Sequence, residues 1–301
     1  MPSTSRADVT AVILTFNEER NLTACLESLV DWVAQVFVVD SGSTDRTVAI
    51  AEQLGATVVT HPFESHAHQW NWALATLPLA SEWVLALDAD QSVTPELCAD
   101  IARSLTTWNG PGAPAGGYIN RRQIFRGKWI RYGGYYPKYM LKLFRRSAVT
   151  IDEGDLVDHH FRVAGLTAKL AGDLIEDNQN EAAIAVWIDK HNRYAVRQAQ
   201  EEIARWTTAA SDAPAGDLFG TPDERALWQK RLWNRFPLYL RPFGYFFYRY
   251  VIRFGFMDGK QGFIFHFLQA FWYRLLVDIN RDELERRQRR GLVDPVKARE
   301  R

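Results

Sequence analysis

The chain of 301 residues is 47% hydrophobic, so it is long enough to bury a sizeable core in one large domain or in one domain with an appendage. Its 36 basic and 36 acidic residues cancel, so the net charge favours no class of partner. Residues 1–8 contain no apolar core, and no uncharged apolar stretch reaches the roughly 20 residues that span a bilayer, so we expect neither a signal peptide nor a transmembrane helix.

Residues 9–100 alternate between strand and helix patterns. Leu22, Leu26 and Leu29 recur at helical spacing, and Thr94-Pro95 has the form of a helix start. Alternation of this kind predicts an α/β fold with a mostly parallel, doubly wound sheet, in which ligands bind at the carboxyl ends of the strands. We expect strands at 9–14, 36–39, 58–59 and 83–87, and helices at 18–30, 45–54, 68–77 and from 94 onward.

Both cysteines lie among apolar neighbours in stretches with a helical pattern. Cys25 and Cys98 are therefore expected to be buried, reduced thiols. Because reduced thiols are typical of the cytosol, the sequence indicates a cytoplasmic protein.

Polar side chains follow three of the expected strands at the point where each one ends. The most informative cluster is Asp88-Ala89-Asp90, which comes directly after the apolar run 83–87. Two carboxylates this close repel each other unless a cation lies between or beside them, and carboxylate oxygens suit Mg²⁺ or Mn²⁺. Such a cation suits a diphosphate, so the sequence predicts a metal site at Asp90, with Asp88 assisting.

The other two clusters suit the nucleoside part of the same ligand. Asp40 is expected to accept a hydrogen bond from a base imide N–H, which favours a uracil-type ring. Thr15, Asn17 and Glu18, after the first strand, are expected to contact the ribose or the base. A structural alternative exists for Asp40 and Asp45, because Asp-Ser-Gly-Ser is also a good turn sequence and aspartate is a good helix cap.

The charge pattern changes sign in the middle of the chain. Residues 118–151 contain nine basic and no acidic residues, whereas 152–160 combine four acidic residues with two histidines. Arg121, Arg122, Arg145 and Arg146 suit the phosphate oxygens of a donor diphosphate or of a phosphorylated lipid. They also fit a solvated face, or a role in balancing the acidic cluster. Beyond this region, 181–206 has a helical pattern and 207–228 resembles an exposed loop.

Residues 236–273 hold 16 of the chain's 39 aromatic residues. The stretch 229–274 contains eight basic residues and a single acidic one, Asp258. Amphipathic helices that lie in the headgroup region of an anionic membrane fit this pattern, with a turn between them at 258–262. The alternative is a helical hairpin buried in the domain or in an oligomer interface. Nucleic acid is not expected as a partner, because the acidic strand ends would oppose it.

Three segments resemble the family 2 glycosyltransferases with the GT-A fold. They are residues 16–22 (Phe-Asn-Glu-Glu-Arg-Asn-Leu), 38–47 (Val-Val-Asp-Ser-Gly-Ser-Thr-Asp-Arg-Thr) and 87–90 (Leu-Asp-Ala-Asp). The resemblance implies a Rossmann-like GT-A sheet and an inverting transfer from a nucleotide-sugar with a divalent metal. It also implies that the donor site includes residues beside those already named: Ser41, Asp45, Asn71 and Ala89.

The resemblance continues into the second half of the chain. Residues 69–74 resemble a segment in which many members have Arg-Asn, and Trp70 takes the usual arginine position here. Residues 118–192 resemble the subgroup that builds bacterial lipopolysaccharide core and exopolysaccharide, which often carries Val-His-Glu where this chain has Val-Asp-His at 157–159. Inversion needs a base on the acceptor hydroxyl. We expect Asp158 in this role, with His159 next as base or metal ligand.

Pairing of the acidic cluster with nearby arginines is an alternative to that role, and a zinc site is a weaker one. The resulting hypothesis is a metal-dependent glycosyltransferase, peripheral on the inner face of the cytoplasmic membrane, that moves a sugar from a UDP-type donor to a lipid-linked saccharide. The alternatives are a polyprenyl-phosphate glycosyltransferase and a non-catalytic scaffold that binds a nucleotide-sugar or lipid. The expected organisation is a nucleotide-sugar-binding half at 1–110, an acceptor-binding half at 111–206, a loop at 207–228 and a membrane-associating helical region at 229–301.

Overall fold

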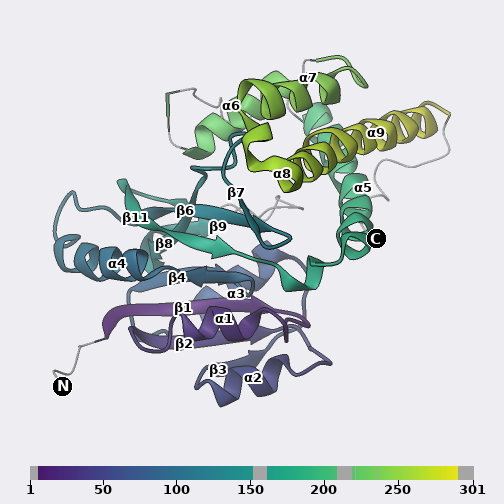
Figure 1. Ribbon diagram of the computed structural model, residues 1–301. Helices are drawn as coiled ribbons and strands as arrows, with labels where there is room; N and C mark the ends of the chain where they lie inside the picture. The colour runs from purple at the N-terminus through teal and green to yellow at the C-terminus, as the bar shows by residue number, and fades with distance from the viewer. Residues whose placement is uncertain (1–5, 152–160, 209–218, 221, 235, 291–301) are drawn as a thin grey trace. The chain divides into compact units, whose positions relative to one another are not determined.

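The computed structural model describes residues 6–151, 161–208, 219–220, 222–234 and 236–290. The chain forms two compact units (Figure 1). Unit 1 comprises residues 1–131 and 135–182, and unit 2 comprises residues 132–134 and 183–301. The chain therefore leaves unit 1 for three residues after Arg131, returns to it at Tyr135, and leaves it again after Ala182.

Unit 1 has an α/β fold, as expected. Its main elements are β1 (Ala7–Thr15), α1 (Leu22–Glu27), β2 (Val33–Asp40), α2 (Thr47–Gln53), β3 (Thr57–Thr60), α3 (His66–Thr76), β4 (Trp83–Asp88), β5 (Gln91–Val93), α4 (Pro95–Thr107), β6 (Gly116–Phe125), β7 (Lys128–Ile130), β8 (Tyr139–Arg145), β9 (Val149–Ile151), β10 (Phe161–Val163) and β11 (Thr167–Glu176). Short 3₁₀ turns lie at Arg146–Ala148 and Gln179–Glu181.

The large sheet of unit 1 is parallel over one half and mixed over the other. Its nine described strands run in the order β3-β2-β1-β4-β8-β6-β11-β5, with β7 paired to β6. β3, β2, β1 and β4 are parallel neighbours, whereas β8 is antiparallel to both β4 and β6. The two-residue turn Arg126-Gly127, with both φ angles positive, lets β7 fold straight back on β6. The expected parallel order therefore holds for the first four strands, and β6 and β11 form one further parallel pair.

Each face of this sheet carries its own hydrophobic core, because side chains alternate along a strand. Ala11 and Ile13 of β1 pack with Leu22 of α1 on one face. Val12 packs with Trp70 of α3 on the other. Since packing covers both faces, the ends of the strands are where polar side chains gather.

The first helix is shorter than its hydrophobic pattern predicts. α1 begins at Leu22 rather than at 18, because Asn17 has a left-handed backbone (φ 56°) and the N–H of Glu18 donates to Thr47 Oγ1 at 2.8 Å. α4 begins as expected, because Thr94 Oγ1 accepts a hydrogen bond from the N–H of Leu97 at 3.4 Å.

Unit 2 is mainly helical in its described residues. Its elements are α5 (Ile184–Thr208), α6 (Pro222–Asn234), α7 (Arg241–Phe247), a π-helical turn η3 (Tyr248–Ile252), a 3₁₀ turn η4 (Gly255–Asp258), α8 (Gly259–His266), a π-helical turn η5 (Phe267–Trp272) and α9 (Tyr273–Arg289). α6 begins inside the stretch 207–228 that was expected as a loop, and the helix expected at 181–206 lies in unit 2. Within the described residues, no helix is long and apolar enough to cross a membrane.

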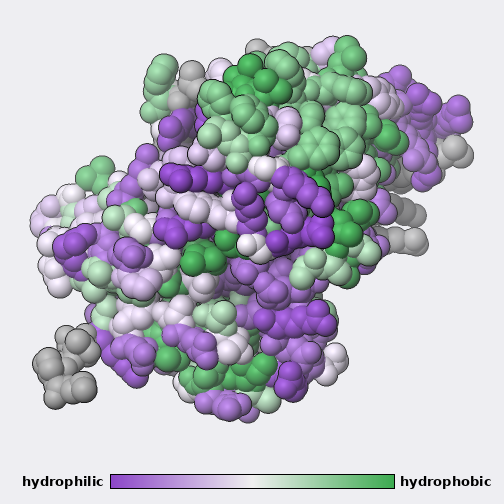
Figure 2. All heavy atoms as spheres, in the orientation of Figure 1, coloured by the Kyte–Doolittle hydropathy of each residue, from purple (hydrophilic) through white to green (hydrophobic). Residues whose placement is uncertain are grey.

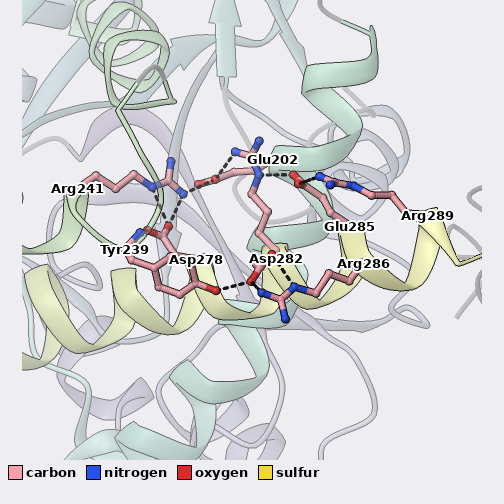
Figure 3. Close-up of polar contacts among 9 residues, drawn as sticks. Glu202, Tyr239, Arg241, Asp278, Asp282, Glu285, Arg286 and Arg289 are labelled. Carbon is pink, nitrogen blue, oxygen red and sulfur yellow. Dashed lines mark hydrogen bonds and ion pairs between the residues drawn. The ribbon is translucent and has the colours of Figure 1, made fainter.

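A buried ion network joins α5, α7 and α9 of unit 2 (Figure 3). Arg241 donates from Nε to Asp278 Oδ1 at 2.7 Å and from Nη2 to Glu202 Oε2 at 2.8 Å. The second Asp278 oxygen accepts a hydrogen bond from the N–H of Tyr239 at 2.9 Å. Because a buried charge without its partner is strongly unfavourable, this network fixes the direction in which the chain enters α7.

Candidate functional site

The carboxyl ends of β1, β2 and β4 lie side by side at one edge of the unit 1 sheet. The parallel register pairs Thr15 with Asp40 and Leu14 with Asp88. Across the first pair, Thr15 Oγ1 donates a hydrogen bond to Asp40 Oδ1 at 3.0 Å. The three polar clusters that the sequence placed at strand ends are therefore neighbours in the structure.

Asp40 is buried, and its carboxylate is occupied by the protein itself. Besides the bond from Thr15, Oδ1 accepts one from the Ser43 hydroxyl at 2.5 Å, and Oδ2 accepts from the N–H groups of Gly42 and Ser43 at 2.9 and 2.8 Å. These donors occupy the acceptor positions of both oxygens. The structure thus favours the structural alternative for Asp40, which holds the turn that follows β2.

Ser41 begins this turn and is held from two sides. Its N–H donates to the carbonyl of Thr15 at 2.9 Å, and its hydroxyl accepts from Gln69 Nε2 at 3.2 Å. Gln69 in turn contacts His61 Nδ1 at 2.7 Å, and the His61 ring stacks on Trp72 with centroids 4.0 Å apart. The sequence analysis did not single out this aromatic pair next to the turn, although His61 directly follows β3.

Asn17 and Glu18 organise the end of β1. Asn17 Oδ1 accepts a hydrogen bond from the N–H of Thr44 at 2.8 Å. The Glu18 carboxylate accepts from the side-chain amides of Asn21 at 2.6 Å and of Asn180 at 3.0 Å. Asn180 comes after β11, so the chain beyond β11 folds across the end of β1. Sequence reasoning missed Asn180 because its partner lies 162 positions away.

Asp45 caps α2 and stabilises the loop before α1. It accepts hydrogen bonds from the N–H of Thr47 at 3.0 Å and of Glu19 at 3.1 Å. Burial alone would raise the pKa of the Asp45 carboxyl, but the hydrogen bonds from the Thr47 hydroxyl and from these backbone groups outweigh it and lower the pKa. Asp45 therefore acts here as a cap, which is the structural alternative considered for it.

Asp88, the last residue of β4, is paired with a lysine of the neighbouring strand. Lys142 Nζ lies 2.9 Å from Asp88 Oδ2, and the two side chains are 6% and 40% exposed respectively. Lys142 is within reach because β8 runs antiparallel to β4. Lys142 therefore offsets part of the electrostatic repulsion between the Asp88 and Asp90 carboxylates. In the sequence, nothing distinguished Lys142 from the other basic residues of the segment 118–151.

The backbone around this pair is tightly packed. Ala89 is 3% exposed and belongs to the hydrophobic core, so it separates the two aspartates without a polar role of its own. Cys25 Sγ lies 3.8 Å from the Asp88 carbonyl oxygen. Burial, together with the negative charges of Asp90 and Asp88, raises the pKa of the Cys25 thiol far above its ordinary value, so this buried sulfur stays protonated at neutral pH.

A second charged pair lies at the same edge. Arg121 Nη1 donates to both oxygens of Glu176, at 2.9 and 3.0 Å. Burial would lower the pKa of Arg121, but the charge and hydrogen bonds of Glu176, with a smaller contribution from Asp90, raise it. Gln91 links the two pairs, because it donates to Glu176 Oε2 at 2.9 Å and accepts from the N–H of Asp88 at 3.2 Å. Glu176 and Gln91 were not foreseen from the sequence.

The four arginines proposed for phosphate do not share one site. Arg121 and Arg122 lie near the carboxyl end of β6, which is parallel to β4 and ends at the same edge. Arg145 pairs with Trp83, the first residue of β4, and stacks over its ring at 4.6 Å. Arg145 and the adjacent Arg146 therefore lie at the opposite edge, about 17 Å away along β4. The four arginines therefore do not form a single phosphate site, because Arg121 and Arg122 lie at one edge of the sheet and Arg145 and Arg146 at the other.

The remaining predicted residues lie on α3 or outside the described residues. Asn71 is half-buried on α3, next to Trp70, which is fully buried and meets Phe161 edge to face at 5.2 Å. Trp70 therefore serves packing where many family members carry an arginine. Asp158 and His159, the expected base residues, lie outside the described residues.

The donor set at this edge suits a divalent cation that is shared with a phosphate ligand. No group of three or more His, Cys, Asp and Glu side chains that could hold a metal occurs among the described residues. Mg²⁺ is commonly held in proteins by one or two carboxylates, with substrate phosphates completing its shell. Asp88 and Asp90 fit an ion of that kind.

Comparison with known proteins agrees with this geometry. Residues 10–154 match the model of the family described as Glycosyl transferase family 2. An uncharacterized glycosyltransferase of Rickettsia felis is 40% identical over 93 residues, which are 31% of this chain and 32% of the relative. The lipopolysaccharide core biosynthesis glycosyltransferase LpsC of Rhizobium meliloti is 33% identical over 88 residues, 28% of this chain and 32% of that protein. The matched region thus spans about a third of the length of these curated relatives.

A solved structure resembles the chain over most of its length. The mannosyltransferase PcManGT from Pyrobaculum calidifontis, determined with GDP-Man and Mn²⁺, matches with a TM-score of 0.51 and 15% identity, covering 92% of this chain and 88% of that one. At this identity the likeness shows the fold, which is the GT-A arrangement expected from the sequence. Residues 10–154, just under half of the chain, therefore match glycosyl transferase family 2.

Proposed function

We propose that unit 1 binds a nucleotide-sugar at the edge where β1, β2, β4 and β6 end, and transfers its sugar to an acceptor. The observation that carries this proposal is the position of Asp88 and Asp90 at the end of a buried strand, with Lys142 and Arg121 at the same edge. A diphosphate is bound by such a mixture of carboxylate-held metal and fixed cations. The match of residues 10–154 to the glycosyl transferase family 2 model supports sugar transfer as the reaction.

Each residue at the edge has a separate task in this proposal. Asp90, assisted by Asp88, would hold Mg²⁺ or Mn²⁺, which would supply positive charge next to the diphosphate of the donor. Lys142, 2.9 Å from Asp88 Oδ2, fixes the orientation of that carboxylate and offsets part of its charge until the ion binds. Arg121, held rigid by Glu176, adds a fixed positive charge on the β6 side.

The nucleoside is proposed to lie over the ends of β1 and β2. Asp40 shapes this part of the site by holding the turn that presents Ser41, and Asn17 is fixed against the same turn through Thr44. The donor is proposed to be a UDP-sugar, so the turn contacts a uracil-type ring through groups that Asp40 positions rather than through Asp40 itself.

We propose Asp158 as the base that takes the proton from the acceptor hydroxyl, with His159 as second choice. This assignment rests on the resemblance of 118–192 to the lipopolysaccharide core and exopolysaccharide subgroup. The ends of the segment that contains both residues are held together, because Ile151 of β9 pairs with Phe161 of β10. If transfer survives Asp158→Asn combined with His159→Ala, an acceptor that is already anionic, such as a polyprenyl phosphate, replaces the hydroxyl acceptor.

The acceptor is proposed to be a lipid-linked saccharide of lipopolysaccharide core or exopolysaccharide synthesis, met at the inner face of the cytoplasmic membrane. The name of the Rhizobium meliloti relative supports the lipopolysaccharide assignment. The aromatic and basic composition of 236–273 in unit 2 supports the membrane location.

Titration calorimetry with UDP, GDP and dTDP, each with and without Mn²⁺, tests the donor site. We expect one nucleotide to bind, and Mn²⁺ to strengthen that binding. Asp90→Asn is expected to abolish the effect of Mn²⁺, whereas Asp31→Asn, which removes the same charge at an exposed position before β2, is expected to leave it unchanged. Absence of binding by every nucleotide in a folded sample would contradict the proposal and favour a non-catalytic scaffold.

A further inference from the structure

The surface of unit 2 is unusually apolar around α7 and α8. Figure 2 shows hydrophobic atoms gathered over these two helices. Six of the large apolar side chains on this surface are between 47% and 58% exposed, namely Phe243, Phe247, Ile252, Phe254, Phe256 and Phe263. Contiguous exposed apolar patches are rare on soluble monomers and mark interaction sites.

The aromatic rings of this surface form a single connected series. Each ring in the series contacts the next, with centroid distances between 4.7 and 6.3 Å. The series links α7 through η5 and α8 to η3 and η4, so the exposed rings are supported by neighbouring rings and keep fixed positions. Its members, in order of contact, are Phe243, Phe271, Phe267, Phe263, Tyr250 and Phe256.

The turn between the two helical segments displays three apolar side chains. It lies at 254–258, whereas the sequence suggested 258–262, because α8 already begins at Gly259. Phe254, Phe256 and Met257 are 56%, 48% and 54% exposed. Phe254 has a left-handed backbone with φ 59°, a conformation that is costly for a bulky residue and persists only where the surroundings enforce it.

Hydrogen bonds to residues 132–134 enforce the conformation of this turn. Asp258, 3% exposed, accepts a hydrogen bond from the N–H of Tyr132 at 2.9 Å. The carbonyl of Arg253 accepts from the N–H of Gly133 at 2.9 Å, and Arg249 Nη1 donates to the carbonyl of Gly133 at 2.7 Å. Residues 132–134, which the chain inserts between β7 and β8, therefore clamp an otherwise apolar turn in place.

The charges around the turn are basic. Arg253 and Lys260 flank it and are exposed, and the only acidic residue between 236 and 277 is the buried Asp258. Exposed basic groups beside exposed aromatics suit a layer of phosphate headgroups above acyl chains. A second copy of the chain suits them less well, because a two-fold contact through this turn would bring like charges together.

We infer that the turn Phe254–Met257 is a membrane-insertion tip, with Arg253 and Lys260 on the phosphates of an anionic bilayer. Phe254, Phe256 and Met257 enter the boundary between headgroups and acyl chains, while the aromatic series behind them lies along the interface. The inference deepens the proposed function by naming the surface on which a lipid-linked acceptor would be met, and it rests on that function to this extent. Binding of the tip to lipid requires neither donor nor acceptor.

Sedimentation of the full chain with vesicles tests this inference. The vesicles are phosphatidylcholine alone, or phosphatidylcholine mixed with phosphatidylglycerol. We expect strong binding to the mixed vesicles and a loss of about tenfold or more on replacing Phe254, Phe256 and Met257 together by serine. The control exchanges Phe63 and Leu166, which are 51% and 62% exposed in unit 1, for serine, and is expected to bind like the wild type.

A charge series sharpens the test. Arg253→Gln with Lys260→Gln is expected to weaken binding to the mixed vesicles about 30-fold and to leave binding to phosphatidylcholine unchanged. The control, Arg126→Gln with Lys128→Gln, removes two exposed charges from the β6–β7 turn of unit 1 and is expected to change neither. Circular dichroism of each variant verifies that it folds.

Three outcomes would overturn the inference. They are a wild-type chain that stays in the supernatant with both vesicle types, a tip variant that sediments like its control, and a wild-type dimer in analytical ultracentrifugation that the tip substitutions dissociate. Nucleotide titration of the same samples reports on the donor site alone, so failure of the tip and failure of the proposed transfer are distinguishable.

Discussion

Units 1 and 2 each bury a basic side chain against an aspartate, but the two pairs differ in what the aspartate can still contact. In unit 2, the side chains of Arg241 and Asp278 are 1% and 0% exposed. In unit 1, Lys142 is 6% exposed, whereas Asp88 is 40% exposed. A pair that is buried on both sides is a fixed part of the fold, while a pair with one partner at the surface retains the capacity to exchange contacts with a ligand.

The same comparison explains why Arg241–Asp278 is a structural ion pair, whereas Lys142–Asp88 belongs to a candidate ligand-binding site. Asp278 also accepts a backbone hydrogen bond from Tyr239, so its oxygens are used within unit 2. Asp88 stands two positions before Asp90 at an edge where the ends of several strands meet. Burial of the cation is therefore common to both pairs, and exposure of the carboxylate distinguishes them.

The largest expected effect concerns the fully buried pair Arg241–Asp278. Asp278→Ala deprives the buried Arg241 guanidinium of the carboxylate that Nε contacts at 2.7 Å, so we expect the free energy of unfolding of the chain to fall by about 3–5 kcal/mol, measured by urea denaturation. Glu283→Ala, which breaks an exposed pair with Arg287 on the same helix, serves as the control and should cost no more than about 1 kcal/mol. Equal losses in the two variants would refute the distinction.

A pH effect extends the comparison to a histidine buried in unit 2. Burial, together with the positive charge of Arg249, lowers the pKa of His266 to about 4. In the unfolded chain the pKa is about 6.5, so the unfolded state binds a proton first as the pH falls. Stability from this group is therefore full above pH 6.5 and declines by about 3 kcal/mol down to pH 4.

Urea denaturation of wild type and His266→Gln across this range measures the effect. The variant should show a flatter dependence on pH between 6.5 and 4. Parallel curves for the two proteins would mean that His266 titrates alike in the folded and unfolded states.

Two glycines with positive φ sharpen the contrast between the clamp of unit 2 and a loop of unit 1. A Cβ on Gly133 would lie 2.0 Å from Cε1 of the buried His266, whereas a Cβ on Gly110 would meet nothing within 4 Å. We expect Gly110→Ala to cost about 1–2 kcal/mol through backbone strain alone. Gly133→Ala should cost about 1–3 kcal/mol more because it also overpacks the site. Thermal denaturation compares them, and similar melting points would argue against a tight clamp.

The smallest expected effect concerns the pair Lys142–Asp88, whose carboxylate is exposed. Lys142→Met removes a positive charge 2.9 Å from Asp88, so the affinity of the free protein for Mn²⁺ should rise about tenfold, as measured by electron paramagnetic resonance. Lys142→Arg keeps the charge and should restore the original affinity. A fall in Mn²⁺ affinity in Lys142→Met would show that the lysine supports the metal site rather than competing with the metal for Asp88.

Local patterns predicted much of unit 1 correctly. The apolar run 83–87 became β4, and Thr94 with Pro95 began α4, because strand periodicity and helix capping involve residues only a few positions apart. The short α1 was not predicted, since its start depends on the hydrogen bond from Glu18 to Thr47. The position of Arg145 at the edge of the sheet opposite Arg121 was not predicted either, because distance along the chain does not reveal at which edge an arginine lies.

By itself, the sequence determined the strand ends, the acidic pair at Asp88 and Asp90, and the concentration of aromatic side chains near the C-terminus. These features follow from residue type and short-range periodicity, which hold wherever the segment folds. Only the tertiary structure decided that Lys142 pairs with Asp88, 54 positions away, and that Arg121 pairs with Glu176, 55 positions away. Strand order sets such neighbours, and strand order depends on how the whole sheet packs.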